Sequence, residues 1–282
     1  MDTSTKSKVG FLLWEKWHGK DSYSIGSSRI RGHWLIKYWD GAESFCQGQE
    51  YDVLILQKVY WAGYCEQFNG IKILDICDPD WLDEVPFKRT LEVVDAVITS
   101  TQPLADYIAQ MTDKPVVYIP DRQDLEFHKK KKVHKGRAKR VCWFGYSHNA
   151  RVLDKVVGFI KKQGVKLVVI SNLRPSYRGA DVNLEWSLDT INDNILDCAF
   201  CLLPEDERPL GKYKSNNKTT KAWALGMPVA RTPDEFLRFL DPDERKKESE
   251  ERTKEVKEKW DVRLSVSQYK ELIDKLKDGK EK

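Results

Sequence analysis

The chain of 282 residues is long enough for about two domains at ~150 residues each, and 40% of its residues are hydrophobic and 33% charged. With 10 Trp, this composition excludes disorder over most of the chain. No apolar run approaches the ~18 residues that a membrane-spanning helix needs, and the apolar stretch near the N-terminus is too short for a signal peptide. We therefore expect a cytoplasmic protein without a transmembrane segment.

The 6 cysteines are too sparse for a disulfide scaffold, and we expect reduced, buried thiols. Cys198 and Cys201 form a CxxC pair. No second CxxC or HxxxH accompanies this pair, so its pattern favours core packing over a metal or redox site. We expect no metal-binding residues.

Charge is distributed unevenly along the chain. Residues 1–125 hold 13 basic and 19 acidic side chains, a net charge of −6, and residues 126–282 hold 35 and 25, a net charge of +10. A basic segment, residues 126–139, predicts either a solvated linker kept extended by repulsion or a contact for nucleic acid or anionic lipid. In the second case the contacting cations are Lys129, Lys130, Lys131, Lys132, Arg137, Lys139 and Arg140.

Apolar runs alternate with helical spacing before the basic segment. A buried strand at 9–15 is followed by a helix at 27–39, which a Ser precedes as a cap. The alternation continues through 51–58, 61–69, 72–78, 91–95, 96–100, 102–111 and 115–120. Because these runs of Val, Ile and Leu are continuous, they favour a parallel sheet buried on both faces. Residues 1–125 therefore predict a doubly wound α/β domain.

The alternation starts again after the basic segment and predicts a second α/β domain, residues 140–260. Its elements are expected at 140–147, 150–163, 166–171, 183–186, 189–197, 199–204, 216–225, 227–230, 233–240 and 242–259. A C-terminal segment, residues 261–282, contains an amphipathic helix at 266–277.

Ligands of open parallel sheets bind beyond the carboxyl ends of the strands, so residues that end an apolar run are candidates for a site. Gly145 ends one run and is followed by Ser147, His148 and Asn149, which lead into a helix. A glycine permits close approach of the backbone, and a helix N-terminus attracts a phosphate. His148 is equally compatible with a residue that only neighbours a helix cap.

A second candidate lies at the start of the helix expected at 216–225. Ser215, Asn216 and Asn217 can cap this helix, and its first turn carries Lys218, Thr219 and Thr220. A cation at a helix N-terminus opposes the helix dipole unless an anion is bound there. This segment therefore predicts a diphosphate site.

Two further candidates lie in the first domain. Arg29 and Arg31 point to different sides of their helix; Arg29 is nearer the helix start and is the favoured ligand contact, with a plain surface cation as the alternative. Asp75, Asp78 and Asp80 cluster at a strand end, where carboxylates serve as a general base, a metal ligand or an acceptor for a sugar hydroxyl. An Asp-Pro-Asp turn is the alternative.

Together these segments resemble nucleotide-sugar glycosyltransferases of the GT-B fold, in particular families 1 and 4. The resemblance covers residues 9–240 and rests on SSRIR, DVLILQK, LDICDPDW, FGYSHN and SNNKTTKAWALGMPVA. It implies two Rossmann-like domains with doubly wound parallel sheets that face each other across a cleft. The C-terminal domain would hold the donor's nucleoside diphosphate, and the N-terminal domain would hold the acceptor.

The resemblance also implies site residues. The turn near the donor phosphates corresponds to Gly145, Tyr146, Ser147 and His148, and the loop beside the nucleobase corresponds to Glu185 and Trp186. Residues 215–220 correspond to the start of the diphosphate-binding helix, and Arg29 to a further donor contact. Retaining relatives carry two glutamates where this chain has Tyr213 and Lys221, so the resemblance does not extend to their chemistry.

The function that this resemblance implies is transfer of a hexose from a UDP- or GDP-sugar to an acceptor hydroxyl, with no cofactor. Asp78 or Asp80 would act as the base if the configuration inverts. Two acceptors remain: a glycan or small molecule, and a hydroxymethylated pyrimidine in phage-type DNA, which the basic segment favours. A non-catalytic module that binds a nucleotide sugar or nucleic acid is the alternative of another class.

Overall fold

The computed structural model describes residues 7–14, 22–79, 86–172 and 175–280. The chain forms two compact units. Unit 1 comprises Met1–Arg122, Lys212–Ser215 and Val262–Lys282, and unit 2 comprises Gln123–Gly211 and Asn216–Asp261. The basic segment is therefore part of unit 2, and the C-terminal segment, apart from Asp261, is part of unit 1.

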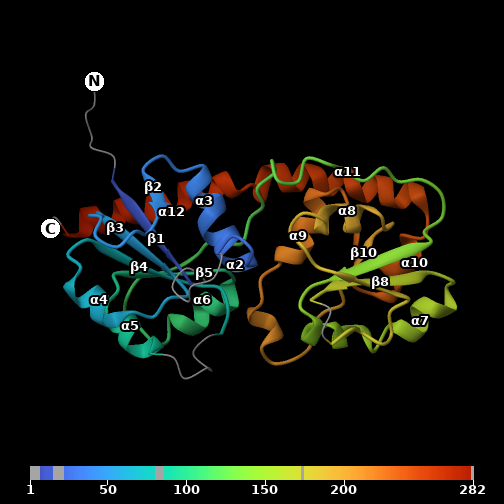
Figure 1. Ribbon diagram of the computed structural model, residues 1–282, viewed down its shortest axis with the longest axis horizontal. Coiled ribbons are helices and arrows are strands. Elements are labelled where there is room, and N and C mark those ends of the chain that lie inside the picture. The colour runs from blue at the N-terminus through green and yellow to red at the C-terminus, as the bar shows by residue number, and fades with distance from the viewer. Residues whose placement is uncertain (1–6, 15–21, 80–85, 173–174, 281–282) are drawn as a thin grey trace. The chain divides into compact units, whose positions relative to one another are not determined.

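Unit 1 is built on a sheet whose described strands pair in the order β2-β1-β3-β4-β5-β6, all parallel (Figure 1). The strands are β1 (Val9–Leu13), β2 (Ala42–Ser44), β3 (Val53–Gln57), β4 (Ile71–Ile76), β5 (Ala96–Thr99) and β6 (Val116–Tyr118). All residues of β1 and β3 are buried, as continuous apolar runs predict. The sequence did not predict β2, a short edge strand that is only partly buried.

The helices of unit 1 include one that departs from α-helical geometry. The expected helix at 27–39 consists of α2 (Gly26–Ser28), a π-helical turn η1 (Arg29–His33) and α3 (Trp34–Lys37). The others are α4 (Ala62–Gln67), α5 (Phe87–Val93), α6 (Gln102–Ile108) and α12 (Val262–Lys280). π-helical turns are rare overall, but those that occur are often found at functional sites. The geometry of η1 therefore sets this segment apart from an ordinary α-helix.

Unit 2 is built on a second parallel sheet with the order β11-β10-β7-β8-β9. Its strands are β7 (Arg140–Phe144), β8 (Lys166–Ser171), β9 (Val182–Glu185), β10 (Cys201–Leu202) and β11 (Val229–Ala230). The central strands β7 and β8 are almost entirely buried. In this sheet the strand order reverses beside β7, and such a reversal is where open α/β sheets bind ligands.

The helices of unit 2 begin with a difference from the sequence prediction. The helix expected at 150–163 is a 3₁₀ helix, η3 (Ser147–Leu153), followed by α7 (Val157–Lys162). The others are α8 (Ile191–Leu196), α9 (Asn217–Ala224), α10 (Pro233–Arg238) and α11 (Pro242–Lys259). The short η4 (Gly211–Tyr213), which precedes α9, begins in unit 2 and continues in unit 1. A capping box of Thr232 and Glu235 starts α10.

The expected fold class, two α/β domains with parallel doubly wound sheets, is confirmed by these two sheets. Each unit has its own apolar core around its central strands. No helix in the described part of the chain has the length and apolarity needed to cross a bilayer.

Candidate functional site

The turn after β7 lies at the reversal of strand order in unit 2. Gly145 has φ +151°, and a Cβ at this position would lie 3.1 Å from the ring of Trp143 and 3.6 Å from Lys218 Nζ. The Lys218 ammonium lies 5.0 Å from the centroid of the Trp143 ring. The glycine turn and the first turn of α9 therefore meet at the carboxyl edge of the sheet. Only a residue without a side chain fits this turn easily.

The start of α9 is not capped as the sequence suggested. Its N-cap residue, Asn216, makes no side-chain hydrogen bond to the helix. The Asn217 amide oxygen accepts a hydrogen bond from Gln123 Nε2 at 3.0 Å, and the Ser215 hydroxyl donates to Asp121 at 2.6 Å. Because the Asn216 side chain makes no hydrogen bond to the first turn of α9, the backbone N–H groups of that turn are available to bind an anion.

The two threonines of this turn are engaged inside unit 2. The Thr219 hydroxyl oxygen accepts a hydrogen bond from Arg231 at 3.0 Å, and that of Thr220 accepts one from Gln123 at 3.0 Å. Both side chains are buried. They therefore position the helix, and Lys218 is the half-buried cation of this turn that lies beside Gly145.

The residues that follow Gly145 form the 3₁₀ helix η3. Ser147 is buried, and its backbone N–H donates to the Asn172 side chain at 2.9 Å. The exposed Tyr146 ring stacks on the His148 ring, with centroids 5.9 Å apart and planes 16° apart. An exposed aromatic pair thus lies directly after the glycine turn.

The residues predicted to contact the nucleobase lie at the end of β9, which is separated from β7 by β8 in the sheet. Glu185 is exposed. Trp186 is half-buried, packs against the core of unit 2, and its backbone N–H donates to the Ser171 carbonyl at 2.9 Å. The indole ring therefore packs against the core of unit 2, directly after the end of β9.

In unit 1, Asp78 follows β4 and Lys58 follows β3. The Lys58 ammonium lies 2.8 Å from the Asp78 carboxylate, whose side chain is 46% exposed. Lys58 is the single non-glycine residue with positive φ, 55°, in the described part of the chain. Such a backbone costs about 1 kcal/mol or more and is frequent at functional sites. Asp80 lies outside the described residues.

Arg29 is buried in unit 1, with only 4% of its surface exposed. Its guanidinium donates hydrogen bonds to the carbonyl oxygens of Tyr23 at 2.8 Å and Ser24 at 3.3 Å. The alternative of a plain surface cation is therefore wrong for this residue. The structure gives it a role in holding the segment before α2.

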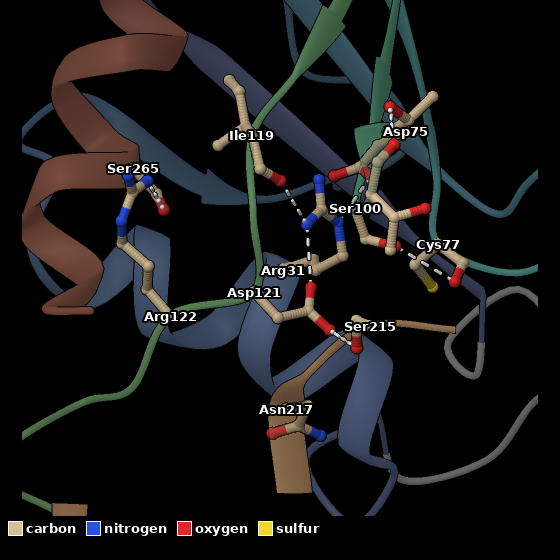
Figure 2. Close-up of polar contacts among 12 residues, drawn as sticks. Arg31, Asp75, Cys77, Ser100, Ile119, Asp121, Arg122, Ser215, Asn217 and Ser265 are labelled. Atoms are coloured by element: carbon tan, nitrogen blue, oxygen red, sulfur yellow. Dashed lines mark hydrogen bonds and ion pairs between the residues drawn. The ribbon is translucent and has the colours of Figure 1, made fainter. Parts of the chain in front are cut away.

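A buried charge network in unit 1, which we define as Arg31, Asp75, Asp121 and Tyr269, was not predicted (Figure 2). Arg31 Nε lies 2.6 Å from Asp75 Oδ1, and Arg31 Nη1 lies 2.8 Å from Asp121 Oδ1. The Tyr269 hydroxyl, from α12, donates to the second oxygen of Asp75. Burial raises the pKa of Asp75 above its ordinary value, although Arg31 opposes this effect.

The buried charge network also holds the segment that precedes α9. Asp121 accepts the hydrogen bond from Ser215 (Figure 2). Nearby, Thr101 Oγ1 donates to the Tyr213 carbonyl at 3.3 Å. Lys212–Ser215 is thus fixed to unit 1, and the chain enters unit 2 at Asn216. One signal in the sequence could have indicated this network, because Asp75 is a charged residue flanked by apolar residues at a fully buried position of β4.

The basic segment packs on unit 2 and is not an extended linker. Lys130 forms an ion pair with Asp193 at 2.7 Å, the Lys131 ammonium donates to the His128 carbonyl at 2.8 Å, and the Lys132 ammonium donates to the Leu196 carbonyl. Burial lowers the pKa of Lys132. Arg140 lies 3.4 Å from Asp197. The remaining cations of the segment are exposed: Lys129, Lys135, Arg137 and Lys139.

The cysteines are free thiols; five are buried, and Cys46 is exposed, against expectation. Cys142 Sγ lies 3.7 Å from Cys201 Sγ inside the core of unit 2. Across the described ranges, no group of three or more His, Cys, Asp or Glu side chains is arranged to hold a metal ion.

Comparisons with known proteins show similarity in fold. No protein-family model matches the chain, and no curated protein matches its sequence. A glycosyltransferase from Rickettsia africae ESF-5 has a TM-score of 0.67 at 8% identity, over 96% of this chain and 99% of that one. AviGT4, a glycosyltransferase involved in avilamycin A biosynthesis, has a TM-score of 0.60 at 12% identity, over 97% and 99%.

A third solved structure, TarM, has a TM-score of 0.59 at 10% identity. The match covers 78% of this chain and 54% of TarM, so the chain spans about half the length of that protein. At these identities the comparisons establish the fold. The chain therefore shares the two-sheet α/β fold of solved glycosyltransferases, as its sequence motifs suggested.

Proposed function

We propose that the protein is a glycosyltransferase that moves a hexose from a nucleotide-diphosphate sugar to an acceptor hydroxyl. The observation that carries this proposal is the meeting of Gly145 and Lys218 at the carboxyl edge of the unit 2 sheet. A diphosphate there would contact a turn without a side chain, an ammonium group and the uncapped first turn of α9. The shared fold with solved glycosyltransferases supports this proposal.

The same groups would assist the chemistry. A departing nucleoside diphosphate gains negative charge as the bond to the sugar breaks, and preorganised donors stabilise that charge. Lys218 and the N–H groups of α9 are such donors. The donor is a UDP- or GDP-sugar in this proposal, with Glu185 and Trp186 near its base and Tyr146, Ser147 and His148 near its phosphates.

Asp78 is the proposed base in an inverting reaction. Its half-exposed carboxylate at the end of β4 is accessible to an acceptor hydroxyl, and the ion pair with Lys58 fixes its position. Lys58 holds this position at the cost of a strained backbone, which supports a functional role for the pair.

The acceptor in this proposal is a small molecule or glycan. AviGT4, which matches the chain over nearly its whole length, is involved in avilamycin A biosynthesis. A hydroxymethylated pyrimidine in DNA is the second candidate, favoured by the exposed Lys129, Arg137 and Lys139. Lys130 is paired with Asp193, and the ammonium groups of Lys131 and Lys132 already donate to backbone carbonyls, which argues against contacts from these three side chains to DNA.

The test of the donor site is calorimetry with UDP and GDP, together with mass spectrometry of UDP- and GDP-sugar hydrolysis. Lys218→Ala should weaken binding of the preferred nucleotide at least tenfold, because a charge-assisted contact is worth about 1.5–3 kcal/mol. Lys161→Ala, an exposed lysine at the end of α7, is the matched control and should bind normally. Equal affinities of the two variants would contradict the site.

The acceptor is tested by transfer to a glycan and small-molecule panel beside DNA that contains hydroxymethylcytosine or hydroxymethyluracil. Transfer to DNA alone would replace the first candidate by the second. Binding of a nucleotide sugar without hydrolysis or transfer to any acceptor would instead indicate a non-catalytic module.

A further inference from the structure

Unit 2 contains a cavity that is separate from the candidate donor site. Its volume is about 250 Å³, far more than the ~10–15 Å³ that one water molecule needs. The basic segment contributes Lys129 and Lys131 to its lining, α9 contributes Trp223, and α11 contributes Thr253 and Lys257. Figure 1 shows the basic segment, in green, running beside α11, in red.

The cavity lies at the C-terminal end of α9, since Ala224, the last residue of that helix, also lines it. Lys218 is in the first turn of the same helix. At 1.5 Å per residue the two ends of this eight-residue helix are roughly 10 Å apart. A ligand in the cavity would therefore not occupy the site beside Gly145.

The charge around the cavity is of one sign. Three ammonium groups line it, and none of the described lining residues is acidic. Hydrogen bonds to the His128 and Ala224 carbonyls fix Lys131 in place. Burial and the charge of Lys257 lower the pKa of Lys131. In the described part of the chain neither Lys129 nor Lys257 has an ion-pair partner, so an anion would relieve their repulsion.

The walls of the cavity are largely apolar. Trp223, Leu125 and the buried Val256 line it beside the lysines. The guanidinium of Arg252 lies 4.7 Å from the centroid of the Trp223 ring, and ion pairs to Glu248 and Glu255 hold it there. The Trp223 ring is therefore held in a fixed position. A bare inorganic ion would leave this apolar surface unused, whereas an organic anion would bury it.

We propose that this cavity binds a phosphate monoester carried on an apolar or aromatic body. Lys129 and Lys257 contact the phosphate, and the body lies against Trp223. This chemistry is shared by nucleoside monophosphates and by phosphates on alkyl chains, and it does not depend on sugar transfer by the protein.

The experiment is calorimetry on the full chain with three probes: adenosine monophosphate, octyl phosphate and inorganic phosphate. We expect at least one organic phosphate to bind tighter than inorganic phosphate by tenfold or more, because apolar surface is buried with it. The tighter of the two organic probes identifies the class of body. No binding of either organic phosphate, or equal affinity for all three probes, would overturn the proposal.

Variants assign the binding to this cavity. Lys129→Ala and Lys257→Ala should each weaken the organic probe about tenfold, and Thr253→Leu, which fills the cavity, should weaken it further. Lys254→Ala is the matched control on α11, since Lys254 is 79% exposed and does not line the cavity. Lys218→Ala should also leave affinity unchanged. Binding that is lost in Lys218→Ala but kept in Lys257→Ala would place the probe at the donor site and refute the proposal. The proposal is also refuted if the affinity for the probe does not change in Lys129→Ala and Lys257→Ala and duplex DNA displaces the probe.

Discussion

Arg31→Met should destabilise unit 1 strongly at neutral pH. The substitution fills a similar volume but removes the cation that lies 2.6 Å from Asp75 and 2.8 Å from Asp121. Both carboxylates are buried, with relative exposures of 0% and 6%. Removing one partner of a buried ion pair costs about 3–5 kcal/mol, because the remaining charge is left uncompensated. We expect a loss of this size at pH 7.

The loss should shrink on acidification. Burial already raises the pKa of Asp75, and without Arg31 it should rise further. A group with a raised pKa in the folded state contributes stability below its ordinary pKa, and this stability is lost as pH rises through the folded value. From pH 7 to pH 5 the variant should therefore regain up to about 1.4 kcal/mol per pH unit for one carboxylate.

Hydrogen exchange of the β3 and β4 amides, corrected for intrinsic rates, measures this change in unit 1 alone. A cost of about 3–5 kcal/mol corresponds to an acceleration of roughly two to four orders of magnitude. Arg89→Met is the control, because the Arg89–Glu66 pair is on the surface and should contribute less than about 1 kcal/mol at either pH. An Arg31→Met deficit that is equal at pH 7 and pH 5 would refute the role of uncompensated charge.

Three further changes test the two units. Tyr269→Phe removes the hydroxyl that Asp75 accepts from, and should cost about 1–3 kcal/mol by the same exchange measurement; protection equal to the unmodified protein would contradict that contact. Gly145→Ala should cost about 1–3 kcal/mol in chemical denaturation and weaken nucleotide binding, whereas Gly158→Ala in open space on α7 should be neutral or stabilising. Asp78→Asn should lower kcat by about 10²–10⁴-fold with unchanged melting, and unaltered turnover would exclude Asp78 as the base.

The sequence by itself determined the fold class and the position of one turn. Continuous runs of Val, Ile and Leu favour a parallel sheet buried on both faces, and the runs at 53–57 and 166–171 do form central strands. Gly145 was identifiable because a glycine that ends such a run marks a close backbone approach. These features are local, so they can be read from neighbouring residues.

Tertiary structure decided the pairing of polar groups. Spacing along a helix could not show that Arg31 would reach carboxylates 44 and 90 residues away, or that Tyr269 would complete the network. Asn217 has a side chain suited to capping, yet it bonds to Gln123, 94 residues distant in the chain. Likewise one of the two predictions for the basic segment was a linker kept extended by repulsion, but the ammonium groups of Lys131 and Lys132 donate to backbone carbonyls and Lys130 pairs with Asp193. Hydrogen bonds of this kind depend on which distant residues the fold brings within 3 Å, and no local pattern encodes that.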